Sequence, residues 1–299
     1  QDVSLQVCEM YARVDDRIVL IDKANSGVAA TRNLGLRQAK GKYLQFVDAD
    51  DTLLPGLWQA LPAAFDAQPG LILYGMVRAS GPAPNPLAPG CYAGPAALGD
   101  ALDPLLFESG YLAAPYPKLF RLDVIRRNKL RFDPRLKINE DVLFNLQYLR
   151  FLLFLQKNSA IYCLAGVYYN QNDMLAGSLS RSLRGDLLDA EAVTRPVLEA
   201  FLTDAKLPAP EIDRLVQISR VRAALNQYGL LTGCPGRMPF AQRRQLFARI
   251  LQDADARAAL RARLTADPNR LLALPYRLGV FLHSAWLLAA YTQLKNRFL

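Results

Sequence analysis

The sequence predicts an α/β fold in its front part, followed by a helical C-terminal region. Short β-branched or aromatic runs alternate with helical stretches as far as residue 169. Beyond residue 184 the apolar residues follow a helical pattern, which is broken at 208–210 and 233–239. The charge is also divided, because 14 Lys and Arg against three Asp give residues 214–299 a net charge of +11. Residues 1–213 carry a net charge of −2.

Strands and helices follow one another at short spacing in the front part, which predicts a mostly parallel sheet with helices on both faces. The predicted strands span 17–21, 43–47, 71–77, the start of 119–128, and 161–169. The predicted helices span 28–39, 55–67, the end of 119–128, and 139–154. Turn residues 25–27 precede the first helix, Gly41 ends it, and Asn139 caps the last helix. Pro62 should disturb the helix over 55–67.

Composition excludes several classes of protein. The chain has 299 residues, of which 52% are hydrophobic and 21% charged, so it is expected to fold into one large or two modest domains. Its four cysteines form no CxxC pair, which argues against a disulfide scaffold or a zinc module. With His283 as the only histidine, a metal would need oxygen ligands and a general base would be a carboxylate.

Three carboxylates stand at the end of the strand predicted over 43–47. Asp48, Asp50 and Asp51 repel one another unless a cation or hydrogen-bond donors are present. Two carboxylates two residues apart on a turn can reach a hard divalent ion that also holds a diphosphate. The alternative is a solvated turn in which an aspartate caps the next helix. A short acidic motif does not by itself separate these interpretations.

Further candidate residues lie later in the chain. Glu140 and Asp141 begin a predicted helix, where a carboxylate could accept a proton from a hydroxyl or could simply complement the helix dipole. Lys118 follows two prolines, and Arg181 lies in the hydroxyl-rich run 178–182. Both cations could hold phosphate oxygens, or they could be ordinary surface residues.

Several of these segments occur together in one order. NSGVAATRNLGL (25–36), AKGKY (39–43) and FVDADD (46–51) resemble the core of family 2 glycosyltransferases, which have the GT-A fold. PKLFR (117–121), NEDVLF (139–144), and YY (168–169) followed by GSLSRS (177–182) are similar to later family motifs. The resemblance covers about residues 1–185. It implies a GT-A domain, a Rossmann-like α/β fold, over 1–185, and leaves 186–299 as a basic helical region.

The resemblance also implies an activity. A family member transfers a sugar from a nucleotide-diphosphate sugar with inversion, using Mg²⁺ or Mn²⁺. It implies that Asp141 is the general base with Glu140 as its neighbour, and that Asp50 binds the metal. The residues implied to contact the donor or close the site are Asn25, Gly27, Arg32, Asp48, Lys118 and Arg181.

The sequence departs from the family pattern at its start. Residues 1–8 align with a helix that normally follows an opening strand, a helix, a second strand and an acidic loop. The domain is therefore expected to be incomplete at its N-terminal side, and a non-catalytic GT-A-like scaffold is the alternative function. The chain has no Gln-x-x-Arg-Trp segment, which disfavours the processive polysaccharide synthases.

The C-terminal region predicts where the protein works. Residues 278–294 carry no formal charge and lie between Arg277 and Lys295. They are too short and too polar for a membrane span, so we expect a helix that either lies in a membrane interface or packs on the catalytic domain. Trp286 and the basic neighbours suit an anionic membrane surface. Nucleic acid is disfavoured, because no zinc spacing or aromatic RNA-binding pattern is present.

Together these observations predict a bacterial-type enzyme at the cytoplasmic face of the membrane. It would add a single sugar to a glycan or lipid-linked acceptor in cell-surface polysaccharide biosynthesis, such as that of capsule, exopolysaccharide or lipopolysaccharide. The surface-glycan assignment follows from the family resemblance alone.

Overall fold

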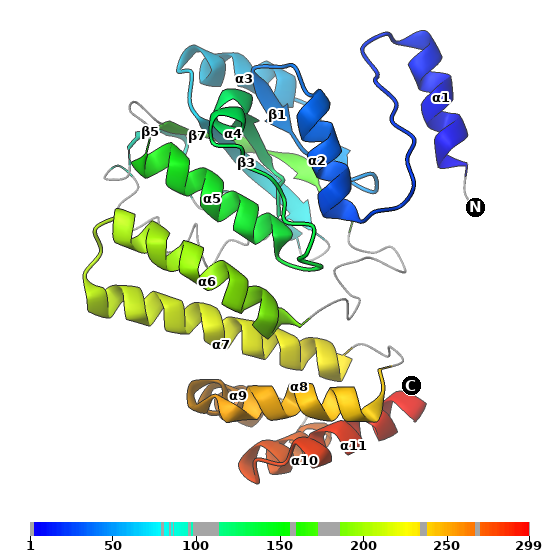
Figure 1. Ribbon diagram of the computed structural model, residues 1–299, viewed down its shortest axis with the longest axis vertical. Coiled ribbons are helices and arrows are strands. Elements are labelled where there is room, and N and C mark those ends of the chain that lie inside the picture. Colours follow the sequence, from blue (N-terminus) through cyan, green and yellow to red (C-terminus); the bar gives the residue numbers. More distant parts are fainter. Residues whose placement is uncertain are drawn as a thin grey trace.

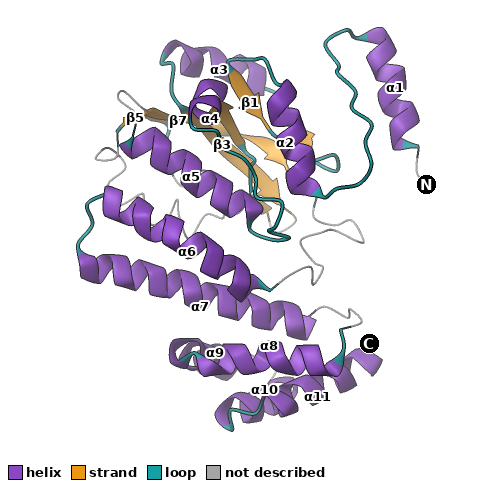
Figure 2. Ribbon diagram, in the orientation of Figure 1, coloured by secondary structure: helices purple, strands orange, loops and turns teal. Residues whose placement is uncertain are grey.

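The computed structural model places a mixed sheet at one end of the molecule and stacked helices at the other (Figure 1). The structure describes residues 3–78, 81–83, 85, 87–94, 97, 114–155, 160–172, 186–233, 238–266 and 270–298. Among these residues, strands are confined to the front part and helices alone follow residue 186, as the secondary-structure colours show (Figure 2). The predicted α/β fold with a helical C-terminal region is therefore confirmed.

The N-terminal segment stands apart from the sheet (Figure 1). Helix α1 (Ser4–Val14) has no buried residue. The strand predicted over 17–21 is wrong: these residues have no regular structure, and Ile18, Val19, Leu20 and Ile21 are between 37% and 72% exposed. A β-branched run forms a strand only where a neighbouring strand can pair with it. No strand among the described residues pairs with this one.

The sheet has the order β1-β6-β3-β7-β2, with β4 paired to β3 and β5 paired to β7. Its strands are β1 (Tyr43–Gln45), β2 (Thr52–Leu53), β3 (Leu71–Arg78), β4 (Gly81–Ala83), β5 (Gly90–Ala93), β6 (Lys118–Arg121) and β7 (Ala160–Asn170). Of the described pairings, only β3 with β7 is parallel, so the sheet is mixed rather than mostly parallel. The reason is that β6 lies antiparallel between β1 and β3. Strands β1, β3 and β7 still run in one direction.

In the described part of the chain, the strands are accompanied by α2 (Val28–Gln38), α3 (Leu57–Asp66), α4 (Leu122–Arg127) and α5 (Glu140–Phe154). Helix α2 begins after Gly27, whose φ of 82° favours glycine. It ends at Gln38 with Ala39 in an extended conformation, so Gly41 is not its C-cap. Asn139 precedes α5 in the left-handed region, and its side chain makes no cap hydrogen bond. Helix α3 continues through Pro62.

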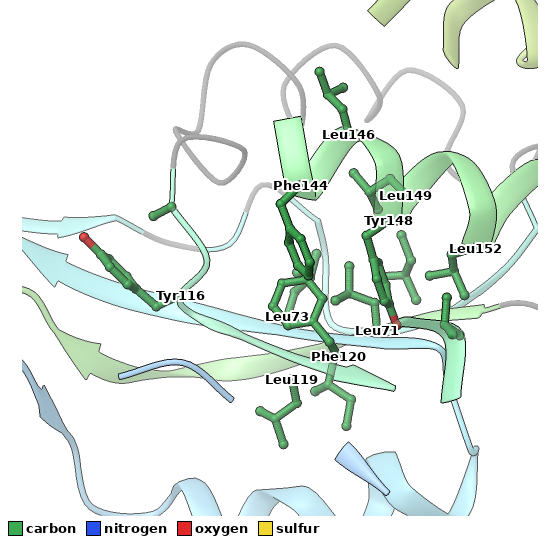
Figure 3. Close-up of a cluster of buried hydrophobic side chains, with 14 of the residues drawn as sticks. Leu71, Leu73, Tyr116, Leu119, Phe120, Phe144, Leu146, Tyr148, Leu149 and Leu152 are labelled. Carbon is green, nitrogen blue, oxygen red and sulfur yellow. The ribbon is translucent and has the colours of Figure 1, made fainter. Parts of the chain in front are cut away.

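Aromatic rings fill the core between the sheet and α5 (Figure 3). Phe144 stacks on Phe132 at 4.3 Å and meets Phe120 edge-on at 5.7 Å. Phe46, which follows β1, meets the rings of Phe120, Phe132 and Phe144 edge-on. Such contacts add to the free energy gained by burying the rings. The first turns of α5 are thereby fixed against the end of β1.

The C-terminal helices lead away from the sheet in layers (Figure 1). They are α6 (Leu187–Asp204), α7 (Ala209–Gly233), α8 (Phe240–Gln252), α9 (Ala254–Ala266), α10 (Arg270–Phe281) and α11 (Ala285–Phe298). The core of the sheet extends into α6 and the first part of α7, as far as Leu215. A second hydrophobic cluster begins at Ala224 in α7 and continues to Ala289. The division into 1–185 and 186–299 remains a prediction, because it falls beside residues 173–185, which are outside the described part.

The uncharged segment 278–294 is not one helix. It is broken between α10 and α11, where His283 has a φ of 51°. Val280 and Leu288, on either side of the break, are both fully buried. In the part of the chain that the structure describes, none of the helices combines the length and apolar character needed to cross a membrane.

Candidate active site

Five elements bring polar side chains together at one edge of the sheet. Helix α2 supplies Arg32, the turn after β1 supplies the three aspartates, and β6 begins with Lys118. Helix α5 begins with Glu140 and Asp141, and β7 ends near Tyr169. Segments far apart in the sequence therefore meet where β1 ends and α5 begins.

Arg32 links two of these segments through its guanidinium. Its Nη1 donates to Glu140 Oε1 at 3.2 Å, and its Nη2 donates to Asp48 Oδ1 at 3.1 Å. The side chains of Arg32 and Glu140 are only 12% and 9% exposed. A charge pair so little exposed to solvent is only weakly screened by salt and is costly to break. One cation thus fixes the acidic turn relative to the start of α5.

Packing holds the guanidinium in place. The carbon of the Arg32 guanidinium lies 5.5 Å from the centre of the Phe132 ring. The next residue, Asn33, exchanges two hydrogen bonds with the Phe132 backbone, at 2.8 Å to its carbonyl and 2.9 Å from its N–H. Helix α2 is therefore anchored to the segment before α5, and Arg32 reaches its carboxylates from a fixed position.

Asp51 is held by Tyr169 and the backbone after β7. The Tyr169 hydroxyl donates to Asp51 Oδ2 at 2.5 Å and accepts the backbone N–H of Asp48 at 3.2 Å. The backbone N–H of Asn172 donates to Asp51 Oδ1 at 2.8 Å. Burial raises the pKa of Asp51, against the effect of these hydrogen bonds. Both carboxylate oxygens of Asp51 are engaged, which gives it a structural role in the turn.

Asp50 differs from its two neighbours. Its side chain is exposed, and no hydrogen bond or ion pair engages it among the described residues. In that part of the chain no three His, Cys, Asp or Glu side chains form a metal-binding group. Mg²⁺ is commonly bound by one or two carboxylates together with substrate phosphates and water rather than by an all-protein cage. The free carboxylate of Asp50 fits that mode of binding.

Asp141 is a half-buried carboxylate next to another one. Burial raises its pKa above the ordinary aspartate value, and the negative charge of Glu140 raises it further, while Arg32 opposes the shift. The Val142 N–H donates to Asp141 Oδ1 at 2.9 Å. A carboxylate whose pKa lies nearer neutrality is better suited to proton transfer than an ordinary aspartate.

Lys118 is buried rather than at the surface. Its Nζ donates to the backbone carbonyls of Ala114 at 2.7 Å and Tyr116 at 3.2 Å. Burial lowers the pKa of Lys118 to about 7, and the charge of Asp141 works in the opposite direction. The charge of the Lys118 ammonium therefore interacts with that of Asp141. The sequence pattern did not indicate that Lys118 would be buried here.

The other predicted residues are placed less centrally. Asn25 and Gly27 are exposed at the start of α2, where Asn25 Oδ1 accepts the Gly27 N–H at 3.0 Å. Arg181 lies outside the described residues. The structure therefore brings together Arg32, Asp48, Lys118, Glu140 and Asp141, with Asp50 on the adjoining turn.

The sequence reasoning missed two tyrosines of this site. Tyr116 stacks on Tyr169 with ring centres 4.5 Å apart and an angle of 5° between the planes. Burial raises the pKa of the Tyr116 hydroxyl, and the charges of Asp48, Asp51 and Asp141 add to the effect. In Figure 3 the Tyr116 hydroxyl points away from the cluster of leucines. Tyr169 belongs to the recognised motif at 168–169, and Tyr116 directly precedes the motif at 117–121, which was the available signal.

Comparison with known proteins shows what the front part of the chain is similar to. Residues 1–98 match the profile of Glycosyl transferase family 2. Uncharacterized glycosyltransferase EpsJ of Bacillus subtilis is 29% identical over 153 residues, which cover 50% of this chain and 44% of EpsJ. Minor teichoic acid biosynthesis protein GgaB, also of B. subtilis, is 39% identical over 66 residues, 22% of this chain and 7% of GgaB. The chain thus spans less than half the length of these curated relatives.

The fold has solved counterparts. The crystal structure of S. aureus TarS 1–349 in complex with UDP-GlcNAc matches with a TM-score of 0.55 and 18% identity, over 100% of this chain and 80% of that one. TarS 1–349 in complex with UDP matches with a TM-score of 0.52 and 19% identity over the same shares. At this identity the match shows a common fold. The chain has the GT-A fold, and residues 1–98 match glycosyl transferase family 2.

Proposed function

We propose that this chain is a glycosyltransferase that moves a single sugar, with inversion, from a nucleotide-diphosphate sugar to a glycan or lipid-linked hydroxyl. The observation that carries the proposal is the linked set of charges at the sheet edge. Arg32 joins Asp48 to Glu140, beside an Asp141 whose pKa is raised. The GT-A fold and the TarS complexes with UDP and UDP-GlcNAc support a nucleotide-sugar donor.

Asp141 is proposed as the general base. Its carboxylate accepts the proton of the acceptor hydroxyl, and the hydroxyl oxygen forms a bond to the anomeric carbon of the donor sugar. The bond between that carbon and the diphosphate oxygen breaks, and the nucleoside diphosphate leaves with the bonding electrons. A raised pKa suits Asp141 to this step, because the best general base has a pKa near the working pH.

Arg32 and Glu140 are proposed to position the base and the donor site. The Arg32 guanidinium compensates part of the negative charge around Asp141 and holds Asp48 towards the donor. Lys118 is proposed to place a positive charge near the diphosphate, with Arg181 assisting or closing the site. Asn25 and Gly27 are proposed to face the donor from the start of α2.

Asp50 is proposed to hold a divalent ion, Mg²⁺ or Mn²⁺, together with the donor. When bound, such an ion supplies positive charge that stabilises the leaving diphosphate. The support for this role is the exposed carboxylate of Asp50, beside two aspartates that other residues already engage.

The cellular setting is proposed from the relatives and from the charge distribution. GgaB is named for teichoic acid biosynthesis, which supports an acceptor in cell-surface polysaccharide synthesis. We assign catalysis to residues 1–185 and association with the cytoplasmic face of the membrane to the basic region 186–299. The net charge of +11 over residues 214–299 supports attraction to anionic lipid.

Donor binding is the first test. A thermal-shift series with UDP, GDP, dTDP and CMP sugars, with and without Mn²⁺, should show a metal-dependent rise in Tm for one class of donor. Asp50→Ala should remove this rise. Asp66→Ala, which removes an exposed aspartate at the end of α3, should keep it. Absence of the rise for every donor would contradict the enzyme assignment and favour the non-catalytic scaffold.

Transfer is the second test. Asp141→Asn keeps the size of the side chain but removes the proton acceptor. Donor binding should remain within about threefold, while the transfer rate should fall by about 10²–10⁴-fold, as for loss of a general base. Release of nucleoside diphosphate in the presence of acceptor measures the rate. An Asp141→Asn variant with the parent rate would overturn the assignment of the base.

A further inference from the structure

Helix α10 has apolar side chains on two opposite faces. One face packs into the second hydrophobic cluster through Ala273, Tyr276 and Val280. The other face is exposed and continues into the turn before α11 and the start of that helix. We name this exposed set the outer stripe; it consists of Leu274 (48% exposed), Leu278 (48%), Phe281 (68%), Leu282 (59%) and Trp286 (56%). The spacing of its first four residues places them on one side of a helix.

The outer stripe lies at the end of the molecule remote from the sheet. In Figure 1, α10 and α11 form the last layer of the helical stack. Contiguous exposed apolar side chains of this size mark interaction surfaces more often than isolated ones do. The candidate active site lies at the edge of the sheet where β1 ends and α5 begins, and none of its residues belongs to the outer stripe.

The charges beside the outer stripe are positive. The Arg261 guanidinium lies 5.7 Å from the centre of the Phe281 ring, and its Nη2 is 3.2 Å from His283 Nε2. Arg263, two residues further along α9, is also exposed but projects from a different side of that helix. No aspartate or glutamate occurs from Pro268 to the last residue, while Arg270, Arg277, Lys295 and Arg297 do. The acidic pair at the start of α9, Asp253 and Asp255, is engaged by Arg220.

We propose that the outer stripe docks onto an anionic lipid bilayer. The apolar side chains would enter the boundary between headgroups and acyl chains, with Trp286 at the level where tryptophan is enriched. Arg261, which lies against Phe281, would meet the lipid phosphates and contribute to the attraction. The helices would lie in the interface without crossing it, in keeping with the lengths of α10 and α11.

Charge favours lipid over a second copy of this chain as the occupant. A symmetric contact through the outer stripe would bring the Arg261 side chains of both copies together, in a region whose net charge is already +11. Anionic headgroups would instead neutralise these cations. The proposal rests on the membrane association proposed above for residues 186–299 and assigns it to one surface. It is independent of the catalytic assignment, because vesicle binding and sugar transfer are measured separately.

Vesicle flotation tests the proposal with the full chain. The probes are phosphatidylcholine vesicles and equimolar phosphatidylcholine–phosphatidylglycerol vesicles. The chain should float with the anionic vesicles, and binding should weaken at high salt. The double variant Phe281→Ser/Leu282→Ser should lose binding by about tenfold or more, because two exposed apolar side chains no longer enter the interface. The matched control Trp58→Ser removes a side chain that is 64% exposed on α3 and should bind like the parent.

A charge series separates the electrostatic part. Arg261→Gln should weaken binding to anionic vesicles roughly fivefold. Arg135→Gln, at a side chain that is 86% exposed in the front part, is the matched control and should have little effect. Equal binding of the Phe281→Ser/Leu282→Ser variant and the parent would overturn the proposal. So would a parent dimer in light scattering that this variant converts to monomer, since a second copy would then be the occupant.

Discussion

The two hydrophobic clusters of the chain have similar compositions but support different surfaces. Both are mostly leucine and alanine with several rings in contact, and in the cluster under the sheet the buried guanidinium of Arg32 lies over the ring of Phe132. The outer helix of the C-terminal cluster, which runs from Ala224 to Ala289, leaves a second apolar face exposed. The first cluster brings Arg32 and Glu140 out of water, whereas the second places cations beside exposed apolar residues.

The difference shows how one chain can hold the groups of a site in position with one cluster and support a lipid-docking surface with the other. Interlocked rings have few alternative packings, so groups that rest on them keep a defined geometry. This suits a site whose carboxylates must stay within hydrogen-bond distance of Arg32. A surface that docks on lipid needs exposed apolar area and positive charge rather than fixed distances between groups. Helices α9 and α10 supply both.

Truncating one ring in each cluster should have the largest effect on the stability of the chain. Phe144→Ala and Phe247→Ala each remove a fully buried ring and should cost about 3–5 kcal/mol of unfolding free energy. Phe144 stacks on Phe132, over which Arg32 lies, so Phe144→Ala should also weaken donor binding. Phe247→Ala should leave donor binding within about twofold of the parent at temperatures where the variant is folded.

Urea unfolding and donor titration measure the two effects. Amide hydrogen exchange then localises the loss, which should concentrate in α5 and β3 for Phe144→Ala and in α8–α11 for Phe247→Ala. If Phe247→Ala weakened donor binding as much as Phe144→Ala, the division of roles between the two clusters would be wrong.

Breaking the Arg32 bridge should have the next largest effect. Arg32→Ala leaves Glu140, which is 9% exposed, without the cation that compensates its charge. The expected loss is about 3 kcal/mol, because removing one partner of a buried pair strands the other charge. The double variant Arg32→Met/Glu140→Gln should recover part of that loss, since no buried charge remains.

A matched surface pair gives the control for Arg32. Arg135 pairs with Asp133 at 2.7 Å, but its side chain is 86% exposed. Arg135→Ala should cost less than about 1 kcal/mol, because solvent screens such a pair. Equal losses at Arg32 and Arg135 in urea unfolding would show that burial does not strengthen the bridge.

Elements with long patterns and clear neighbours could be predicted from the sequence. Helix α5 and strand β3 agree with the prediction to within one residue at each end, because their apolar runs are long and both are buried in the same core. The segment 17–21 has an equally good strand composition but lacks a partner strand among the described residues. The break at His283 also could not be foreseen, because it depends on how α10 and α11 pack against α8 and α9.

The candidate site, like the fold, could be predicted from the sequence only in part. The motifs indicated Asp48, Glu140 and Asp141, but not that Arg32 would bridge two of these motifs. Tyr169 looked like an ordinary strand residue, and its hydrogen bond to Asp51 depends on where β7 ends relative to the acidic turn. The burial of Lys118 could not be inferred either, since a lysine after two prolines is usually exposed.

The pH dependence of stability in Asp141→Asn should be the smallest of these effects. The pKa of Asp141 in the folded protein is raised by burial and by Glu140, so the folded state binds this proton more tightly than the unfolded state does. The stabilisation from the protonated form is present below the ordinary aspartate pKa and is lost as the pH rises through the raised value. Asparagine stays neutral at every pH, so the variant should be more stable than the parent between the ordinary and the raised pKa of Asp141. The gain in unfolding free energy should reach about 2 kcal/mol at the upper end of this range, since a tenfold change in proton affinity corresponds to about 1.4 kcal/mol.

Urea unfolding of both proteins from pH 4 upward measures this difference, with Asp255→Asn as the matched control from the C-terminal cluster. Asp255 is 45% exposed and paired with Arg220, so its replacement should change stability by less than about 1 kcal/mol over the same range. A gain for Asp141→Asn that accompanies loss of transfer would show that the chain gives up stability to keep a carboxylate in the site. If Asp141→Asn were no more stable than the parent at any pH, Asp141 would not be desolvated, and its proposed fitness as a base would lose its physical cause.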